Sequence, residues 1–498
     1  MKRSNITLSN SLFFENSGQV FNVTAPHWLT ESVITGIMRL IDCVLSLLTG
    51  VMAASILTLR QSEIEYINLD QTQVYALIAA TLLTANVFHL SKLYHLDADG
   101  LLSLMPGRIV AGWSMVVFIL LALGFATRTT VDISRLWVGL WFTMGLTAIM
   151  LARLTCVIQI RLWRSNGHLT RRIAVVGGGP CSRRLIEDLI SDSKLFINLI
   201  GYFEDNREHP MPRPDDVPVA GTIDDLIRLA REGKIDQIII ALSSDNSKYL
   251  GTWTRRFLDL SVNVSVYSDL INNLSLPRYV TQLGTIPLLT IIERPLPGWS
   301  YIIKTAEDYI LATILLIVAA PLMMIIALAI LLDSPGPIFF RQMRYGLNNQ
   351  PIEILKFRTM WHEIQRLNSS EPVRQATRVD PRVTPVGWLL RRSSLDELPQ
   401  LINVLRGEMS VVGPRPHAIV HNHLYAGMVD AYSARHRVKP GITGWAQVQG
   451  LRGEILSKEM IEKRIAHDLY YIDNWSLGLD VRILFRTVLF GFVHEMAY

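Results

Sequence analysis

Residues 305–332 read TAEDYILATILLIVAAPLMMIIALAILL, an apolar run with Pro321 near its middle. About 20 consecutive apolar residues are enough for an α-helix to cross a bilayer. A proline inside a helix removes one backbone hydrogen bond and kinks or breaks the helix, at a cost of about 3 kcal/mol. The stretch therefore predicts a membrane helix that is broken at Pro321.

Positive charges stand on both sides of this run. Lys304 precedes it, and Arg341 and Arg344 follow it. A helix that crosses a membrane carries most of its flanking positive charge on one side, the cytoplasmic one. The charges therefore favour a re-entrant helix–break–helix hairpin that enters one leaflet and returns. A true fifth membrane span is the alternative.

Four more apolar segments fill the first third of the chain: 37–58, 74–91, 109–126 and 136–156. Basic residues gather before the first, between the second and third, and after the fourth: Lys2, Arg3, Lys92, Arg108, Arg153, Arg161, Arg164, Arg171 and Arg172. The loop after the first segment is mainly acidic instead. The distribution predicts four transmembrane helices with the N-terminus and everything after residue 160 in the cytoplasm. Four buried helices of a soluble bundle are the alternative.

Composition agrees with a membrane protein of a reducing compartment. Half of the 498 residues are hydrophobic and 18% are charged, against about 25% charged in an average soluble domain. The net charge of +5 suits anionic lipid or phosphorylated substrates, and no nucleic-acid-binding motif accompanies it. The cysteines Cys43, Cys156 and Cys181 form no C-x-x-C pair, which argues against a disulfide framework or a zinc site. The polar start of the chain predicts no cleavable signal peptide.

From Arg172 onward, buried strands alternate with amphipathic helices. The segments are IAVVGGGP (173–180), SRRLIEDLI (182–190), NLIGYFED (198–205), TIDDLIRLAREG (222–233), IDQIIIALS (235–243) and VNVSVYS (262–268). This alternation predicts a parallel, Rossmann-like α/β domain.

Gly177 and Gly179 follow the first strand of that domain and could let a phosphate approach a helix N-terminus. Ser182 replaces the third glycine of G-x-G-x-x-G, so a purely structural tight turn is an equal alternative. A sugar dehydratase with this layout would need Tyr-x-x-x-Lys, which is missing between residues 171 and 290. A regulatory or spacing module is therefore the preferred interpretation.

The C-terminal part is dense in glycine, proline, arginine and carboxylate. Its motifs are DSPGPIFFRQMRYG (333–346), LKFRTM (355–360), DPRVTPVGWLLRRSSLDELPQLINVLRGEMSVVGPRP (380–416), VKPGITGWAQVQGLRGE (438–454) and DLYYIDNWSLGLD (468–480). Its candidate phosphate ligands are Arg341, Arg344, Lys356, Arg358, Arg391, Arg392, Arg415 and Arg437. Asp396 and Glu397 offer carboxylates for a magnesium ion or for nucleophilic attack. A solvated helix face is the alternative for this dipeptide taken alone.

The histidines of this part do not make a convincing zinc site. His417 and His421 are spaced i, i+4 with His423 nearby, but no matching carboxylate cluster accompanies them. His362-Glu363 lacks the second histidine of a zinc-protease helix.

These motifs carry a resemblance. Lys-Phe-Arg-Thr-Met, Ser-Leu-Asp-Glu-Leu-Pro-Gln, Gly-Pro-Arg-Pro and Lys-Pro-Gly-Ile-Thr-Gly-Trp-Ala-Gln-Val closely resemble the catalytic domain of the bacterial sugar transferases, polyprenyl-phosphate phosphoglycosyl transferases with a monotopic core. The four leading helices and the nucleotide-fold domain look like the long-form members, which initiate exopolysaccharide repeat units. The tail, Leu-Arg-Gly-Glu and then Asp-Leu-Tyr-Tyr-Ile, is similar to members that transfer glucose 1-phosphate to undecaprenyl phosphate.

The resemblance implies a two-step reaction at these positions. Asp396 attacks the β-phosphorus of a UDP-sugar and releases UMP, and undecaprenyl phosphate then takes the sugar phosphate from Asp396. Glu397 holds Mg²⁺, the expected cofactor. The expected phosphate ligands are Lys356, Arg358, Arg391, Arg415 and Arg437. Glucose is the favoured sugar, with galactose, an N-acetylhexosamine or a non-catalytic assembly scaffold as alternatives.

The whole chain is thus expected to be a multi-domain protein of the bacterial inner membrane. Its expected parts are a cytoplasmic segment (1–33), a four-helix transmembrane bundle (34–160), a Rossmann-like α/β cytoplasmic domain (161–295) and a mostly α catalytic domain with a re-entrant hairpin (296–498). The catalytic domain is expected on the cytoplasmic face, in contact with membrane lipids. A homodimer is compatible with the sequence.

Overall fold

The structure is a computed structural model with two compact units, the helices before residue 170 and the chain from Arg171 onward. Each is described by itself. The structure describes residues 30–60, 69–94, 105–129, 133–165, 170–177, 180–191, 197–204, 219–242, 249–268, 280–284, 286–361, 380–429, 431–451 and 457–490.

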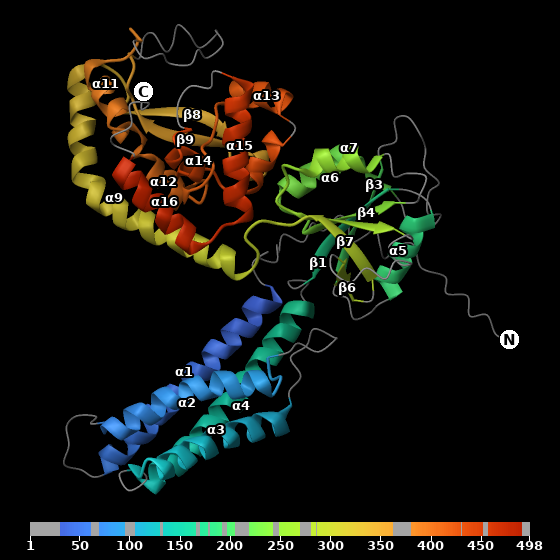
Figure 1. Cartoon of the computed structure of the whole chain (residues 1–498), viewed down its shortest axis with the longest axis vertical. Helices are drawn as coiled ribbons and strands as arrows, with labels where there is room; N and C mark the ends of the chain where they lie inside the picture. Colours follow the sequence, from blue (N-terminus) through green and yellow to red (C-terminus); the bar gives the residue numbers. More distant parts are fainter. Residues whose placement is uncertain are drawn as a thin grey trace, which may run out of the picture. The chain divides into compact units, whose positions relative to one another are not determined.

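The first unit is a bundle of four helices (Figure 1). They are α1 (Glu31–Arg60), α2 (Gln71–Leu90), α3 (Pro106–Ala126) and α4 (Arg135–Ser165). Each of the four predicted apolar segments forms one of them. α1 and α4 are longer than predicted because their polar ends continue the helix, and an apolar window does not detect polar turns. With α9 of the second unit, these helices are long and apolar enough to cross a membrane.

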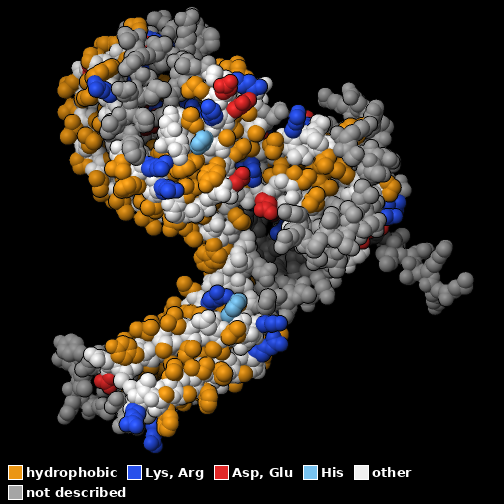
Figure 2. Space-filling model, viewed as in Figure 1, with side chains coloured by type: hydrophobic (Ala, Val, Ile, Leu, Met, Phe, Trp, Pro, Cys, Tyr) orange, Lys and Arg blue, Asp and Glu red, His pale blue; other side chains and the backbone are white. Residues whose placement is uncertain are grey.

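Aromatic side chains and one ion pair hold the bundle together. The indole of Trp137 donates to the Gly50 carbonyl (3.0 Å) and that of Trp141 to the Ser46 carbonyl (2.8 Å). Asp42 of α1 and Arg153 of α4 form a buried salt bridge. Figure 2 shows that the outer face of the bundle is covered mainly by hydrophobic side chains. An apolar outside around a paired charge is the pattern of a helix bundle in lipid.

The second unit begins with the predicted α/β fold. Its seven-stranded sheet has the order β3-β2-β1-β4-β5-β7-β6. The strands are β1 (Arg171–Val176), β2 (Ile197–Phe203), β3 (Val219–Gly221), β4 (Gln237–Leu242), β5 (Asn263–Ser268), β6 (Val280–Leu283) and β7 (Ile286–Ile292). The helices are α5 (Pro180–Ser191), α6 (Ile223–Arg231) and α7 (Leu250–Phe257). β1 to β5 pair in parallel, and the β6–β7 hairpin, which the sequence pattern did not predict, adds an antiparallel edge.

Gly177 has a structural reason to be glycine. Its φ is +107°, and an added Cβ would lie 2.4 Å from the Ala241 carbonyl oxygen. The buried hydroxyl of Ser182 donates to the Gly177 carbonyl (2.5 Å). These contacts require a tight turn at Gly177 whether or not a ligand binds, so they favour the structural alternative. Gly179 lies outside the described residues.

α9 (Trp299–Asp333) opens the catalytic part and differs from the predicted helix–break–helix. The helix continues through Pro321, and Figure 1 shows that it bends along its length. Pro321 therefore weakens the helix without ending it, because it removes only one helical hydrogen bond.

Each half of α9 packs into a hydrophobic cluster of the C-terminal part. Ala312 in the first half belongs to the cluster around Val411, and Ile330 in the second half packs with Phe357. Near its start, buried Lys304 pairs with Asp308 (3.1 Å) and with Asp480 (2.7 Å). The remaining surface of α9 is hydrophobic (Figure 2).

The rest of the catalytic part is mostly helical, as expected, with two small two-stranded sheets. Its strands are β8 (Phe339–Tyr345), β9 (Pro351–Phe357), β10 (Ser410–Val412) and β11 (Gly441–Thr443). Its helices are α11 (Pro385–Arg392), α12 (Gln400–Leu405), α13 (Ile419–Met428), α14 (Trp445–Val448), α15 (Lys458–Asp473) and α16 (Leu477–Phe490), with 3-10 turns η4 (Leu347–Asn349), η6 (Leu395–Glu397) and η7 (Tyr432–Arg437).

Candidate active site

A short turn between two helices carries Asp396 and Glu397. The Thr384 hydroxyl caps α11 by accepting from the Gly387 amide (3.0 Å), and α11 ends at Arg392. Ser394 then adopts φ +58°, a left-handed conformation that non-glycine residues rarely take. The chain reverses there into η6, and α12 follows directly. The two carboxylates are therefore held by helices on both sides.

Glu397 is buried and bound by two cations. Its Oε1 accepts from Lys356 Nζ (2.8 Å) and from Arg415 Nη2 (2.6 Å), and its Oε2 accepts from Arg415 Nη1 (3.0 Å). Burial alone would raise the pKa of Glu397, but Arg415 and then Lys356 outweigh it and hold this pKa well below its usual range. Glu397 is therefore ionised at neutral pH and holds Lys356 and Arg415 beside Asp396.

Asp396 lies in a different electrostatic setting. Its Oδ2 is 4.0 Å from Lys356 Nζ. Burial raises the pKa of Asp396, Lys356 opposes the rise, and the charge of Glu397 adds to it. Neighbouring carboxylates with oppositely shifted pKa values indicate different roles. The more basic Asp396 suits nucleophilic attack, because a carboxylate with a raised pKa binds an electrophile more strongly.

Two further arginines border this pair. Arg391 donates to the Thr359 hydroxyl (2.9 Å) and interacts electrostatically with Asp396. Arg344 donates to the Pro416 carbonyl. Burial and then the charge of Arg415 lower the pKa of Arg344 to about 10. Sequence reasoning placed Arg344 only among the general cations, and its half-buried position on β8 accounts for its closeness to the site.

The structure brings Lys356, Arg391 and Arg415 to Asp396, but it uses the other two expected phosphate ligands elsewhere. Arg358 donates to the Pro335 carbonyl (2.9 Å) and the Ser334 hydroxyl (2.9 Å), beyond the end of α9. Arg437 donates to the Glu293 carbonyl. Arg358 follows β9 directly, so the strand alternation that aims Lys356 into the site does not extend to it.

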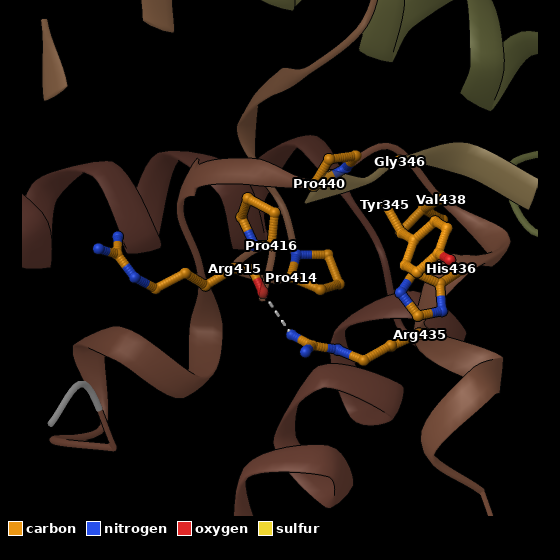
Figure 3. A pocket seen from close by; sticks show the side chains of 9 residues that line it. All are labelled: Tyr345, Gly346, Pro414, Arg415, Pro416, Arg435, His436, Val438 and Pro440. Carbon is orange, nitrogen blue, oxygen red and sulfur yellow. Dashed lines mark hydrogen bonds between the residues drawn. The ribbon is translucent and has the colours of Figure 1, made fainter. Parts of the chain in front are cut away.

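A second layer of polar residues supports Arg415 from behind. Arg435 Nη2 donates to the Arg415 carbonyl (2.7 Å) and to Asp468 (2.7 Å). Figure 3 shows the first bond, with the Arg415 side chain pointing away from Arg435. A small hollow that is open to solvent lies beside this backbone and is lined by Tyr345 and His436 among others. Sequence reasoning missed Arg435 and Asp468. Asp468 begins the motif DLYYIDNWSLGLD (468–480), whereas Arg435 lies between two of the quoted motifs.

The histidines near this layer are structural in their contacts. His417 and His421 both pack against the Tyr425 ring. Among the residues that the structure describes, no group of three or more His, Cys, Asp or Glu could hold a metal ion. His362 and Glu363 lie outside the described residues.

Two histidines, His417 and His436, should make the stability of the fold depend on pH. Burial and then the charge of Arg435 lower the pKa of His417 well below its ordinary value of 6.5 and that of His436 to about 3. The unfolded chain binds these protons near pH 6.5 and the folded chain does not, so the free energy of unfolding falls as pH drops below 6.5. We expect a loss on the order of 2 kcal/mol per histidine at pH 5.

Denaturant unfolding at pH 7.5 and pH 5 measures this loss. His436→Gln should shrink the difference between the two pH values. His423→Gln, at an exposed position, should leave it unchanged. Equal stability at both pH values would contradict the assignment of neutral, buried imidazoles.

The Lys-Pro-Gly-Ile-Thr-Gly motif positions the loop of Arg415. Gly441 donates to the Pro414 carbonyl (3.0 Å), and Gly413 donates to the Thr443 carbonyl (2.8 Å). A Cβ on Gly441 would lie 2.1 Å from the Gly413 nitrogen. Gly441→Ala should therefore push this loop away, lower the free energy of unfolding by about 1–3 kcal/mol, and reduce activity. Gly427→Ala, with no atom within 4 Å of its added Cβ, is the matched control in unfolding and activity assays.

The two carboxylates form a donor set that suits magnesium. Mg²⁺ binds oxygen ligands, usually one or two carboxylates together with substrate phosphates. Glu397 Oε2 accepts one hydrogen bond where Oε1 accepts two, which leaves Oε2 a lone pair for an ion. The residues therefore fit an ion that takes its remaining ligands from a bound diphosphate.

Comparisons with known proteins show which family the chain resembles. The family model described as bacterial sugar transferase matches residues 299–494, and the one described as CoA-binding domain matches residues 93–267. The chain is 38% identical to "UDP-glucose:undecaprenyl-phosphate glucose-1-phosphate transferase" of Escherichia coli K12, over 73% of this chain and 76% of the relative. It is 37% identical to the protein of the same name from Klebsiella pneumoniae, over 78% and 82%.

The name of a third relative refers to another sugar. It is the "UDP-N-acetylgalactosamine-undecaprenyl-phosphate N-acetylgalactosaminephosphotransferase" of Aeromonas hydrophila, 42% identical over 40% of this chain and 46% of its own length.

Proposed function

The chain belongs to the bacterial sugar transferases, and from this premise we propose that it transfers glucose 1-phosphate from UDP-glucose to undecaprenyl phosphate and releases UMP. Two relatives matched over about three quarters of the chain or more carry that activity in their names. The product would be the first lipid-linked sugar of an exopolysaccharide repeat unit. Galactose or an N-acetylhexosamine is the second candidate, since the Aeromonas relative is named for N-acetylgalactosamine.

The observation that carries the proposal is the environment of Asp396, an enclosed carboxylate of raised pKa among cations that suit two phosphates. In the first step an Asp396 oxygen bonds to the β-phosphorus, and the bond from that phosphorus to the bridging oxygen breaks. UMP leaves with the electron pair. In the second step a phosphate oxygen of undecaprenyl phosphate attacks the same phosphorus and frees Asp396. The cofactor, Mg²⁺ held by Glu397, would neutralise diphosphate charge.

The negative charges of both substrates favour a reaction in two steps. Both substrates are polyanionic, and direct attack of one phosphate on another would bring their charges together. Attack by Asp396 removes UMP before the second substrate reacts. Lys356 and Arg415 then offset the negative charge that remains on the transferred phosphate.

The membrane placement is part of the same proposal. α9 has a hydrophobic outer surface, and both of its halves pack on the catalytic core. A helix that returns to its own domain favours re-entry over a crossing, with the catalytic domain and its nucleotide sugar on the cytoplasmic face of the inner membrane. Cysteine labelling would place residues such as Glu459 in the cytoplasm. Labelling from the periplasm would overturn re-entry and favour a fifth span.

One assay tests the reaction against its rivals. Membranes that contain the protein are incubated with UDP-glucose, Mg²⁺ and undecaprenyl phosphate, and UMP release is measured. A nucleotide-sugar dehydratase or an assembly scaffold would release no UMP. An assay without UMP release would therefore refute the proposal. UDP-galactose and UDP-N-acetylhexosamines in the same assay identify the sugar.

Glu397→Gln tests the metal role. The amide keeps the shape of the side chain but loses the charge that holds Lys356 and Arg415. We expect UMP release to fall by at least about 100-fold, as when a buried ion pair loses one partner, and the Mg²⁺ concentration for half-maximal residual activity to rise. A variant with wild-type activity and an unchanged Mg²⁺ response would exclude Glu397 as the magnesium ligand.

A further inference from the structure

Asp308 of the membrane helix α9 is hydrogen-bonded to β10. Its Oδ1 accepts from the Val411 amide (3.0 Å) and from the Ser410 hydroxyl (2.8 Å). All three residues are buried, and the most exposed of them is Asp308 at 6%. Hydrogen bonds to an ionised acceptor are about twice as strong as those between neutral groups. A charged side chain, and not apolar packing alone, therefore holds β10 on α9.

Lys304 fixes the same carboxylate from within α9. Its ammonium lies 3.1 Å from Asp308 Oδ1 and 2.7 Å from Asp480 Oδ2. Lys304 and Asp308 stand one helical turn apart, where side chains of opposite charge can meet. Asp308 Oδ1 thus meets one ammonium and two hydrogen-bond donors. A buried carboxylate needs such compensation, and here the compensation also defines where β10 lies.

β10 continues directly into the loop that carries Arg415. Val411 precedes Arg415 by four positions, and Pro414 and Pro416 stand on either side of Arg415. A proline fixes its own φ and restricts the conformation of the residue before it. The segment therefore has few conformations with which to absorb a displacement of β10, and a shift of Val411 is passed on to Arg415.

We propose that Asp308 is a positioning residue of the reaction, which sets the place of the Arg415 guanidinium by holding β10 on α9. The inference rests on the proposed function, in which Arg415 offsets the charge of the transferred phosphate. The two hydrogen bonds from Arg415 to Glu397 (2.6 and 3.0 Å) depend on where this loop lies. In the described part of the chain Asp308 makes no hydrogen bond with Asp396 or Glu397, so its effect has to pass through β10.

The first test is Asp308→Ala in the full-length protein in nanodiscs. The change removes the acceptor of the Val411 amide, whereas the Ser410 hydroxyl can still donate to the Val412 carbonyl (2.7 Å). We expect kcat for UMP release to fall roughly 10- to 100-fold, since a misplacement of about 1 Å can cost a factor of 100.

Asp308→Asn separates the hydrogen bond from the charge. The amide keeps an oxygen that can accept from Val411 and loses the negative charge beside Lys304, so most of the rate should return. A loss as large as that expected for Asp308→Ala would show that the charge alone matters and would overturn the inference. This comparison with the wild type decides the question even if Asp308→Ala does not fold.

A double-mutant cycle with Arg415→Met distinguishes positioning from a general structural role. If Asp308 acts through Arg415, Asp308→Ala should lower kcat by less than about twofold once Arg415 is gone, because the effects of coupled residues do not add. An equal loss in both backgrounds would show that the two residues act independently and would overturn the inference.

Glu307→Gln is the matched control. Glu307 precedes Asp308 on α9 and its side chain is equally buried, but in the described part of the chain neither of its oxygens accepts a hydrogen bond from β10. The variant should leave kcat unchanged in both backgrounds. A wild-type protein that releases no UMP would refute the proposed function and this inference with it. An active wild type with equal losses in both backgrounds would overturn this inference alone.

Discussion

Asp396→Asn should abolish sugar-phosphate transfer. The variant keeps the size and most contacts of the side chain, but an amide cannot form the acyl phosphate on which both steps depend. We expect kcat for UMP release to fall by at least about 10⁴-fold, as when other covalent catalysts lose their nucleophile. Radiolabelled UDP-glucose without acceptor should label the wild-type protein and leave the variant unlabelled.

Asp473→Asn provides the matched control for this change. Asp473 is an exposed carboxylate at the end of α15, so its loss should not alter turnover or labelling. If Asp396→Asn kept near wild-type turnover, the nucleophile would have to be another group, and a direct transfer between the two substrates would replace the two-step route.

Arg415→Met should have the second-largest effect. It removes both hydrogen bonds from Arg415 to Glu397 and leaves the buried carboxylate with Lys356 alone. Breaking a buried ion pair from one side costs about 3–5 kcal/mol, which corresponds to roughly 10²- to 10⁴-fold in rate if the loss falls on the transition state. Arg415→Lys should recover part of the rate, because a lysine keeps the charge without the two-pronged guanidinium.

Arg392→Met controls for the loss of a positive charge near the site. Arg392 lies over the exposed ring of Trp388 and outside the contacts of Glu397. Denaturant unfolding of each variant shows whether the cost falls on folding or on catalysis. If Arg415→Met lost stability and kept kcat, Arg415 would only hold Glu397 in place and would not bind the substrate.

The elements predicted from the sequence are those with a strong local pattern. The four apolar helices and the α/β alternation follow from hydrophobic periodicity, which neighbouring residues decide. The bent α9 differs from the expected break because tertiary packing on both halves, through Ala312 and Ile330, holds the helix together across Pro321. The β6–β7 hairpin was missed because the four residues of β6 are too few to show a periodic pattern.

Some residues of the candidate site could likewise be selected from the sequence and others could not. Asp396, Glu397 and Arg415 stand in dense motifs and could be selected from the sequence, whereas Arg358 occurs in a motif of equal density and stabilises a helix end instead. A motif shows that a residue is constrained but not by which contact. Arg435 could not be selected in advance, because its role depends on its contacts with Asp468 and with the Arg415 carbonyl.

The pair of Lys304 with Asp480 sets an order of events during synthesis. The two residues are 176 positions apart, so α9 leaves the ribosome long before its lysine can meet this carboxylate. In the interval only nearby acids of α9, such as Asp308, can accompany the charge. The catalytic domain closes around the membrane helix when α16 arrives. The apolar α9 is thus synthesised well before Asp480, the partner of its buried lysine.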